Sequence, residues 1–212
     1  MNGLKGRREL KHAITKADCH LLRKNLQNFM RLDPHGLDGK YLIRSVHFDN
    51  FDDKILRQKT EGFYHRDKFR ARLYDLDTDF INLEKKSKRN NLTYKQKCRL
   101  SAREYERIRS GDIHWMSGDS RDILRDLYVQ ITLFQIKPTI VVDYERDVFI
   151  YEYGNVRVTF DSNVKTGYRD TDFLNPELIM VDALDPDCVI LEIKFDVFIP
   201  DIIQKFGMPF LN

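Results

Sequence analysis

The segment from His65 to Lys88, HRDKFRARLYDLDTDFINLEKKSK, constrains the fold more than any other part of the chain. It predicts two β-strands joined by a polar turn at residues 75–79. Because strand side chains alternate between two faces, each strand has one charged and one apolar face. The first strand carries Arg66, Lys68, Arg70 and Arg72 opposite Phe69, Ala71 and Leu73. The return strand carries Asn82, Glu84, Lys86 and Lys88 opposite Ile81 and Leu83.

The basic face of this hairpin needs an explanation of its own. Like charges on alternate residues of a strand lie about 7 Å apart. At an effective dielectric constant near 20, each such pair repels by about 2 kcal/mol, and burying the cations unpaired costs more. The face is therefore exposed to water, paired with carboxylates or occupied by a polyanion. Exposure to water is the simplest explanation for a single basic strand.

Composition limits the classes of protein to consider. A chain of 212 residues with 42% hydrophobic and 33% charged residues predicts one soluble domain over residues 1–212. The net charge of +3 argues against a protein that coats nucleic acid. Three widely spaced cysteines form neither a disulfide framework nor a zinc pattern, which favours the cytoplasm. We find no signal-peptide pattern and no apolar run near the roughly 20 residues of a membrane span.

The rest of the chain predicts an α+β fold of mainly antiparallel strands, because strands and helices do not alternate as βαβ units. Helices are expected over 15–31, 50–58, 101–111 and 120–135, with a further one starting at 201. Capping boxes at Thr15/Asp18 and Ser101/Glu104 mark two of the helix starts, and Gly111 marks one helix end. Strands are expected over 7–12, 41–48, 92–100, 139–153, 156–161, 178–183 and 188–195.

The charged pattern of the hairpin recurs in other strands. Three E-x-K triplets each place a carboxylate beside an ammonium on one face: Glu9/Lys11, Glu84/Lys86 and Glu192/Lys194. Arg146 shares a face with Tyr144, and Arg157 with Thr159 and Asp161. If the sheet closes into a barrel with its helices outside, these residues line the interior.

Such an interior suits a chain of phosphates with a divalent metal. Cations bind the phosphate oxygens and carboxylates hold the metal ion. A nucleic-acid channel would also present aromatic side chains for base stacking, but here the aromatic residues fall mostly on the opposite face. The pattern therefore favours phosphate without a base.

At this point the sequence resembles a known family, the VTC domain of polyphosphate polymerases, within the triphosphate tunnel metalloenzyme (CYTH-like) superfamily. The matching motifs follow the family order over nearly the whole chain. They are RRELKH (Arg7–His12), IRSVHFDN (Ile43–Asn50), HRDKFRARLY (His65–Tyr74), NLEKKSK (Asn82–Lys88), YER (Tyr144–Arg146), VRVTFDSN (Val156–Asn163) and LEIKF (Leu191–Phe195).

The resemblance implies an antiparallel barrel that encloses a basic tunnel, with helices packed outside. Such tunnels bind triphosphate, polyphosphate or a nucleoside triphosphate together with Mg²⁺ or Mn²⁺. The residues implied to bind phosphate are Lys11, Arg70, Arg72, Lys86, Arg146, Arg157 and Lys194. Glu192 is implied as a metal ligand, with Glu9 and Glu84 as further candidates, and no other catalytic residue is assigned.

Two departures from the family pattern stand out. His12 replaces the aromatic residue that usually follows the first E-x-K. The closing S-K-Y-type segment, which supplies a late tunnel lysine, is absent before Asn212. We therefore expect either a chain truncated at its C-terminus or a site without that lysine.

Three functions remain open on the sequence. The first is a metal-dependent phosphotransferase of the polyphosphate polymerase type, in which the end of a growing chain is the nucleophile. The second is a triphosphatase, in which water attacks. The third is a non-catalytic module that binds polyphosphate or inositol phosphates. None involves nucleic acid, and a membrane partner is left open. The pattern by itself predicts that Lys95 is solvated and that His47 is structural.

Overall fold

The structure, a computed structural model, describes residues 6–34, 36, 39–168 and 170–207. The chain divides into two compact units. Among the described residues, unit 1 comprises Ile43–Asp143 and Thr166–Val181, and unit 2 comprises those of Lys5–Leu42, Tyr144–Lys165 and Asp182–Asn212. Four of the described strands supply residues to both units: β3 (Lys40–Asp49), β7 (Lys137–Tyr151), β8 (Val156–Gly167) and β9 (Met180–Asp182).

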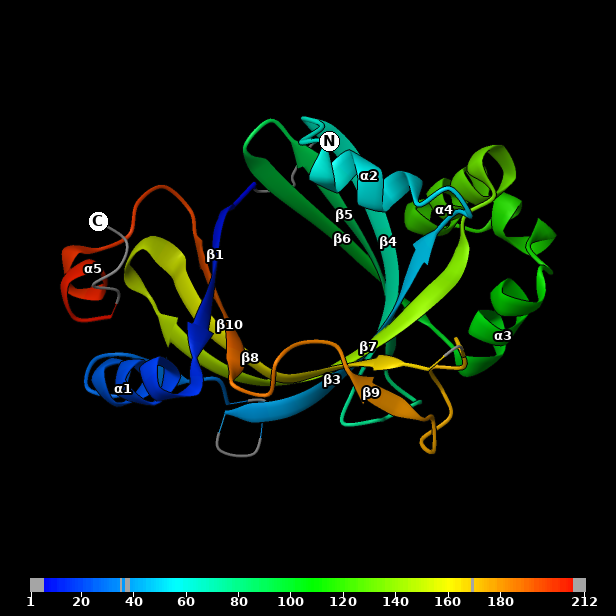
Figure 1. The fold of residues 1–212 in the computed structure, drawn as a ribbon. Helices are drawn as coiled ribbons and strands as arrows, with labels where there is room; N and C mark the ends of the chain where they lie inside the picture. Colours follow the sequence, from blue (N-terminus) through cyan, green and yellow to red (C-terminus); the bar gives the residue numbers. More distant parts are fainter. Residues whose placement is uncertain (1–5, 35, 37–38, 169, 208–212) are drawn as a thin grey trace. The chain divides into compact units, whose positions relative to one another are not determined.

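Unit 1 is built around the predicted basic hairpin (Figure 1). Its strands β4 (His65–Tyr74), β5 (Ile81–Arg89) and β6 (Leu92–Leu100) follow β3 in an antiparallel order. Its helices are α2 (Lys54–Thr60), α3 (Ala102–Ser110), the 3-10 helix η1 (His114–Gly118) and α4 (Asp122–Phe134). The hairpin, the strand over 92–100 and both long helices are as predicted.

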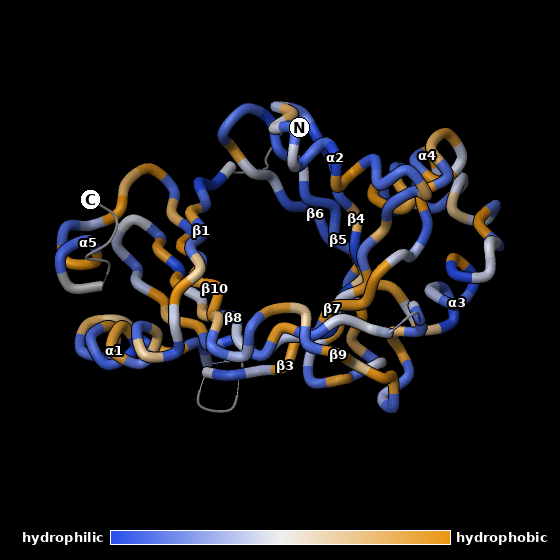
Figure 2. Tube along the Cα trace, viewed as in Figure 1, coloured by the Kyte–Doolittle hydropathy of each residue, from blue (hydrophilic) through white to orange (hydrophobic). Residues whose placement is uncertain are grey.

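The core of unit 1 lies between the apolar face of these strands and the helices α3 and α4, which lie on one side of β4–β6 in Figure 1. Phe69 and Leu73 of β4 are buried in one hydrophobic cluster with Tyr105 of α3 and Leu127 of α4. Figure 2 colours long stretches of β5 and β6 as hydrophilic, because the other face of these strands is charged. The prediction that the apolar face packs is confirmed.

Unit 2 has its own sheet and its own core. Strands β1 (Arg8–Thr15) and β10 (Cys188–Phe195) pair antiparallel, and β10 pairs in turn with β8. The buried core includes Leu22 of α1 (Lys16–Leu26), Phe160 of β8, Leu191 of β10 and Ile203 of α5 (Asp201–Gly207). The 3-10 helix η2 (Tyr153–Asn155) precedes β8.

The first helix ends earlier than the sequence predicted. We expected it to reach about Arg31, but α1 ends at Leu26. Arg31 and Leu32 instead form the short strand β2 (Arg31–Leu32), which pairs with Ile150 and Phe149 of β7. Pairing with a strand more than 100 residues away therefore overrides the helical periodicity of this segment. No local sequence pattern predicts this pairing.

The hydrogen-bonded strand order is β1-β10-β8-β7-β3-β4-β5-β6, with β2 on β7 and β9 (Met180–Asp182) on β8. A largely antiparallel α+β fold is therefore confirmed. In the part of the chain that the structure describes, β1 and β6 are the two ends of this order. Hydrogen bonding thus does not confirm the expected barrel closure, and the single domain over 1–212 stays a prediction. Among the described residues, no helix has the length and hydrophobicity needed to cross a membrane.

Candidate functional site

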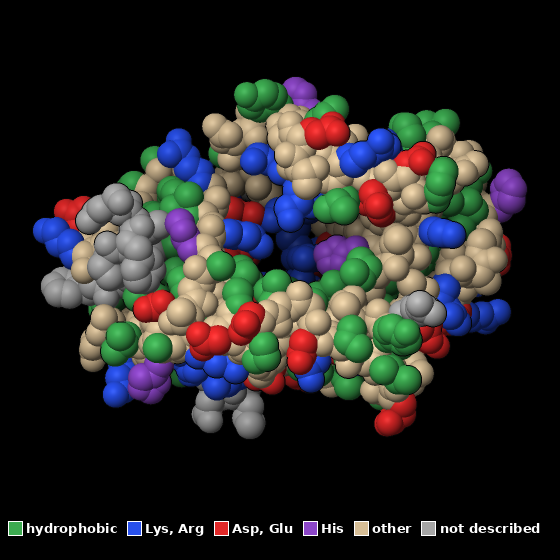
Figure 3. All heavy atoms as spheres, in the orientation of Figure 1, with side chains coloured by type: hydrophobic (Ala, Val, Ile, Leu, Met, Phe, Trp, Pro, Cys, Tyr) green, Lys and Arg blue, Asp and Glu red, His purple; other side chains and the backbone are tan. Residues whose placement is uncertain are grey.

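The basic face of unit 1 is assembled by strand register. Paired positions align His47 with Arg70, Arg70 with Glu84, and Glu84 with Lys97 across β3, β4, β5 and β6. The neighbouring rows are Ser45–Arg72–Asn82 and Lys68–Lys86–Lys95. In Figure 3, Lys and Arg side chains gather over the strands that Figure 1 labels β5 and β6. We call the residues of these three rows, together with the charged side chains that contact them on the same face, cluster A.

Glu84 is the buried centre of cluster A. Its side chain is 2% exposed, and its carboxylate lies 2.6 Å from Arg70 and 2.5 Å from Lys95. Burial opposes ionisation, but the cations of Arg70, Arg72 and Lys95 outweigh it and hold the pKa of Glu84 below its ordinary value. Cluster A is therefore a charged carboxylate enclosed by an excess of cations.

The other members of cluster A are also held in place. Arg72 is almost fully buried, and its Nε donates to Ser45 Oγ at 3.0 Å. Burial, followed by the charges of Arg70, Arg72 and Lys68, lowers the pKa of His47 to about 3. His47 is thus neutral at pH 7 and adds no charge to a face on which Lys86 lies half-buried.

A second arginine pair in unit 1 lies apart from these rows. Arg44 donates to both oxygens of Asp143, through Nε at 2.9 and 3.1 Å and Nη2 at 2.8 Å, and Nη1 donates to the Asn175 carbonyl at 2.6 Å. Both side chains are less than 10% exposed. These bonds use all three nitrogens of the guanidinium and both oxygens of a buried carboxylate, so we assign the pair a structural role.

Unit 2 contains a comparable cluster around Glu192, which we call cluster B. One oxygen of its carboxylate lies 3.1 Å from Lys11, and the other lies 2.5 Å from Lys194 and 3.9 Å from Arg146. Burial opposes ionisation of Glu192, but these cations keep its pKa below the ordinary value. Burial also lowers the pKa of Lys194 to about 8, so the pair is charged at pH 7.

The arginines of cluster B are bound to carboxylates. Arg146 forms a bidentate pair with Asp161, with two bonds of 2.6 Å. Arg157 donates to Asp33 and to the hydroxyl of Tyr41, both at 2.8 Å. These partners hold the guanidinium groups in fixed orientations. A phosphate bound here would have to share the guanidinium groups with the carboxylates or displace the carboxylates.

The structure places all ten predicted site residues, four in cluster A and six in cluster B. Cluster A holds Arg70, Arg72, Glu84 and Lys86; cluster B holds Glu9, Lys11, Arg146, Arg157, Glu192 and Lys194. Glu9 lies opposite Lys194 in the register.

Several contacts of these residues were missed. The sequence assigned Lys95 to solvent, whereas Lys95 Nζ pairs with Glu84. The turn at residues 90–91 fixes the register of β5 and β6, and this register places Lys95 and Lys97 close to Glu84. The contact could therefore have been predicted from the sequence. No comparable signal joins Arg157 to Asp33, which lies 124 residues away.

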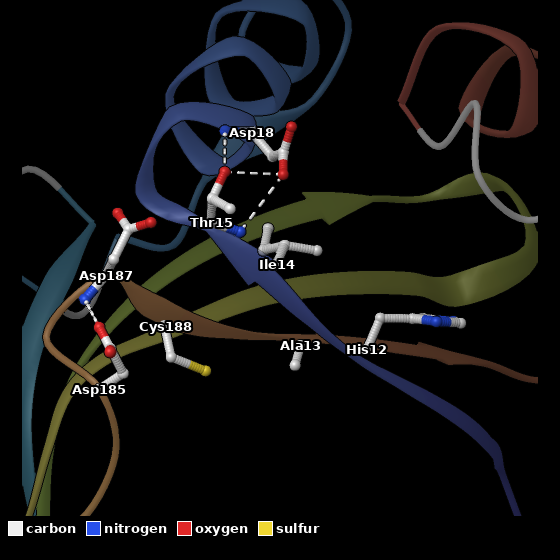
Figure 4. A pocket seen from close by; sticks show the side chains of 8 residues that line it. All are labelled: His12, Ala13, Ile14, Thr15, Asp18, Asp185, Asp187 and Cys188. Atoms are coloured by element: carbon white, nitrogen blue, oxygen red, sulfur yellow. Dashed lines mark hydrogen bonds between the residues drawn. The ribbon is translucent and has the colours of Figure 1, made fainter.

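A surface pocket of about 550 Å³ in unit 2 is not part of either cluster (Figure 4). Its polar groups stabilise local structure: Thr15 and Asp18 form the capping box of α1, and the Asp187 amide donates to the Asp185 carboxylate. None of the described residues that line it is a lysine or an arginine. The pocket is therefore unsuited to a phosphate chain.

The carboxylates fit a divalent metal only in one way. Among the described residues, no three His, Cys, Asp or Glu side chains come together as a metal-binding group. Mg²⁺ is commonly bound by one or two carboxylates plus the oxygens of a phosphorylated substrate. Glu192 in cluster B and Glu84 in cluster A each supply one buried carboxylate. The residues thus fit a metal that arrives with phosphate.

Comparisons with known proteins identify a family and a fold. The family model described as the VTC domain matches residues 6–207. The crystal structure of a putative adenylate cyclase from Bacillus halodurans covers 97% of this chain and 92% of its own, at 18% identity and a TM-score of 0.59. Two proteins from Pyrococcus horikoshii reach TM-scores of only 0.46 and 0.47, at 11% and 12% identity, covering 95% of this chain and 85% and 90% of theirs. No curated protein matches.

Proposed function

Because the chain belongs to the VTC domain family, we propose that it binds triphosphate or polyphosphate on clusters A and B and extends polyphosphate from a nucleoside triphosphate. The observation that carries this proposal is the pair of buried carboxylates, Glu84 and Glu192, each in contact with two cations, together with the excess of cations around Glu84 in cluster A. A polyanion is the ligand that such an excess attracts.

The proposed chemistry needs no nucleophile from the protein. Phosphoryl transfer depends mainly on in-line positioning and on neutralising charge on the transferred group. Lysines and arginines of both clusters would bind the phosphate oxygens. The terminal phosphate of a growing chain would attack. The closed tunnel expected from the family resemblance belongs to this proposal.

A divalent metal, Mn²⁺ or Mg²⁺, is part of the proposal. When bound, it would neutralise the charge that develops on the transferred phosphoryl group. Glu192 is the proposed ligand in cluster B, with Glu9 beside it, and Glu84 is the candidate in cluster A. We also propose a cytoplasmic location, since the three cysteines are free thiols.

The test compares two adjacent lysines of β5 by calorimetric titration with tripolyphosphate and Mn²⁺. Lys86 belongs to cluster A, whereas Lys85 points to the other face and pairs with Asp126 of α4 at 2.6 Å. We expect Lys86→Ala to weaken binding about tenfold, since a hydrogen bond to a charged group contributes about 1.5 kcal/mol or more. Lys85→Ala should bind as wild type does.

Two outcomes would contradict the proposal. Wild-type protein that does not bind tripolyphosphate with or without metal would refute it. Equal losses in both variants would show that the loss does not depend on which face carries the lysine. If binding is observed, the products formed from ATP distinguish the three functions. Growth of a polyphosphate chain indicates a polymerase, and release of inorganic phosphate indicates a triphosphatase. The absence of both products indicates a binding module.

A further inference from the structure

Thr159 is a buried residue of β8 beside cluster B, and its hydroxyl has no explained role. Its side chain is fully buried on β8, and Oγ1 has no hydrogen-bond partner among the residues that the structure describes. Buried polar atoms are nearly always paired, and leaving one unpaired costs free energy. Valine has almost the same shape without this cost, so the hydroxyl calls for a functional explanation.

The position of Thr159 points to Glu192. The two residues are direct partners in the antiparallel register of β8 and β10. Side chains at such positions share a face, with Cβ atoms about 5 Å apart. The hydroxyl does not donate to Glu192 in this structure, where one carboxylate oxygen pairs with Lys11 and the other with Lys194.

We propose that Thr159 is a positioning residue for Glu192, whose carboxylate it holds by a hydrogen bond once phosphate and metal bind in cluster B. This inference rests on the proposed function. A phosphate chain attracts Lys11 and Lys194 away from Glu192, because it carries more negative charge than one carboxylate. The carboxylate of Glu192 would then be turned towards the metal, and the hydroxyl of Thr159 fixes its orientation.

The physical reason is the usual arrangement around metal ligands. A ligating carboxylate is normally hydrogen-bonded on its other side, and removing that partner typically costs 10- to 100-fold in metal affinity. The hydroxyl makes no hydrogen bond in the free protein and makes one to Glu192 in the bound state. The free energy of that hydrogen bond therefore contributes only to binding. Thr159 therefore favours binding at the expense of the stability of the free protein.

The first experiment measures the free protein. We expect Thr159→Val to unfold at the same urea concentration as wild type or at a higher one, since it removes an unpaired polar atom. A lower midpoint would overturn the proposal, because it would mean that the hydroxyl is already bonded without ligand.

The second experiment measures tripolyphosphate binding by calorimetry with Mn²⁺ and with EDTA. Thr159→Val should bind about tenfold more weakly than wild type with Mn²⁺ and equally well in EDTA. Thr159→Ser, which keeps the hydroxyl, should restore binding. If Thr159→Val lost as much affinity in EDTA as with Mn²⁺, the proposed role would be wrong. The same holds if Thr159→Ser bound tripolyphosphate as weakly as Thr159→Val does.

A double-mutant cycle identifies the residue through which Thr159 acts. In a Glu192→Gln background, Thr159→Val should have no further effect on binding with Mn²⁺, because the carboxylate that it positions is gone. Additive losses would overturn the proposal. If wild-type protein does not bind tripolyphosphate at all, the proposed function fails too; if it binds and Thr159→Val equals wild type, only this inference fails.

Discussion

At the scale of single residues, the two clusters follow one rule. A carboxylate is buried at the centre, and cations around it more than compensate for the lost hydration. Glu84 and Glu192 are each 2% exposed, and each has two cations within 3.1 Å. The carboxylate holds the neighbouring cations together. In cluster A the cations outnumber Glu84, whereas in cluster B the carboxylates of Glu9, Asp33 and Asp161 offset the further cations.

This rule predicts a pH dependence of stability for Glu84. Its pKa is lower in the folded protein than in the unfolded chain, since Arg70, Arg72 and Lys95 outweigh burial. The carboxylate therefore stabilises the fold above the unfolded pKa, near 4.3, and this contribution is lost as pH falls towards the folded pKa. We expect Glu84→Gln to destabilise by about 2 kcal/mol at pH 7, and by progressively less from about pH 5 downwards.

Urea unfolding at several pH values measures this difference. Glu106→Gln is the matched control, because Glu106 pairs with Arg109 on the exposed surface of α3, where an ion pair contributes about 0–1 kcal/mol. A Glu84→Gln penalty that is the same at pH 3 and pH 7 would refute the electrostatic explanation.

At the scale of elements, local signals define some ends and not others. The capping box Ser101/Glu104 begins α3, and Gly111 ends it in a left-handed conformation with a φ of 86°. Both were predicted, because each depends on residues within one turn of the helix. The end of α1 was not predicted, since it depends on the pairing of β2 with β7.

Gly111 allows a clean test of backbone conformation. A Cβ added at Gly111 would meet no atom within 4 Å, and the same holds for Gly118 in η1. The two positions differ in φ, which is strongly positive only at Gly111. Gly111→Ala should therefore destabilise by about 1 kcal/mol.

Gly118→Ala should change stability little, or raise it slightly, by restricting the unfolded chain. Thermal unfolding of both variants checks the pair. If the two substitutions have the same effect, the left-handed conformation at Gly111 is not what requires glycine.

At the scale of the whole molecule, the chain builds two hydrophobic cores, one in each unit. The sequence predicted one domain. Since β3, β7 and β8 supply residues to both units, we propose that the two cores unfold together. The chain has a single tryptophan, Trp115, which lies in unit 1 and packs against its core.

Leu191→Ala tests this proposal, because Leu191 is fully buried in the core of unit 2. We expect a loss of about 2–5 kcal/mol, and the same shift of the urea midpoint by Trp115 fluorescence and by far-ultraviolet circular dichroism. A Trp115 transition that stays at the wild-type midpoint would show two independently unfolding domains.

The sequence by itself determined which residues share a face. Period-two alternation placed Arg70 with Arg72 and Glu84 with Lys86, each pair opposite the apolar residues of its own strand, because side chains of a strand alternate between two faces. Only the tertiary structure decided which carboxylate holds which cation. Arg146 with Asp161, Arg157 with Asp33, and Thr159 opposite Glu192 depend on how distant strands align. Register is set by packing over the whole sheet, and a shift of one residue would turn every side chain of a strand to the other face.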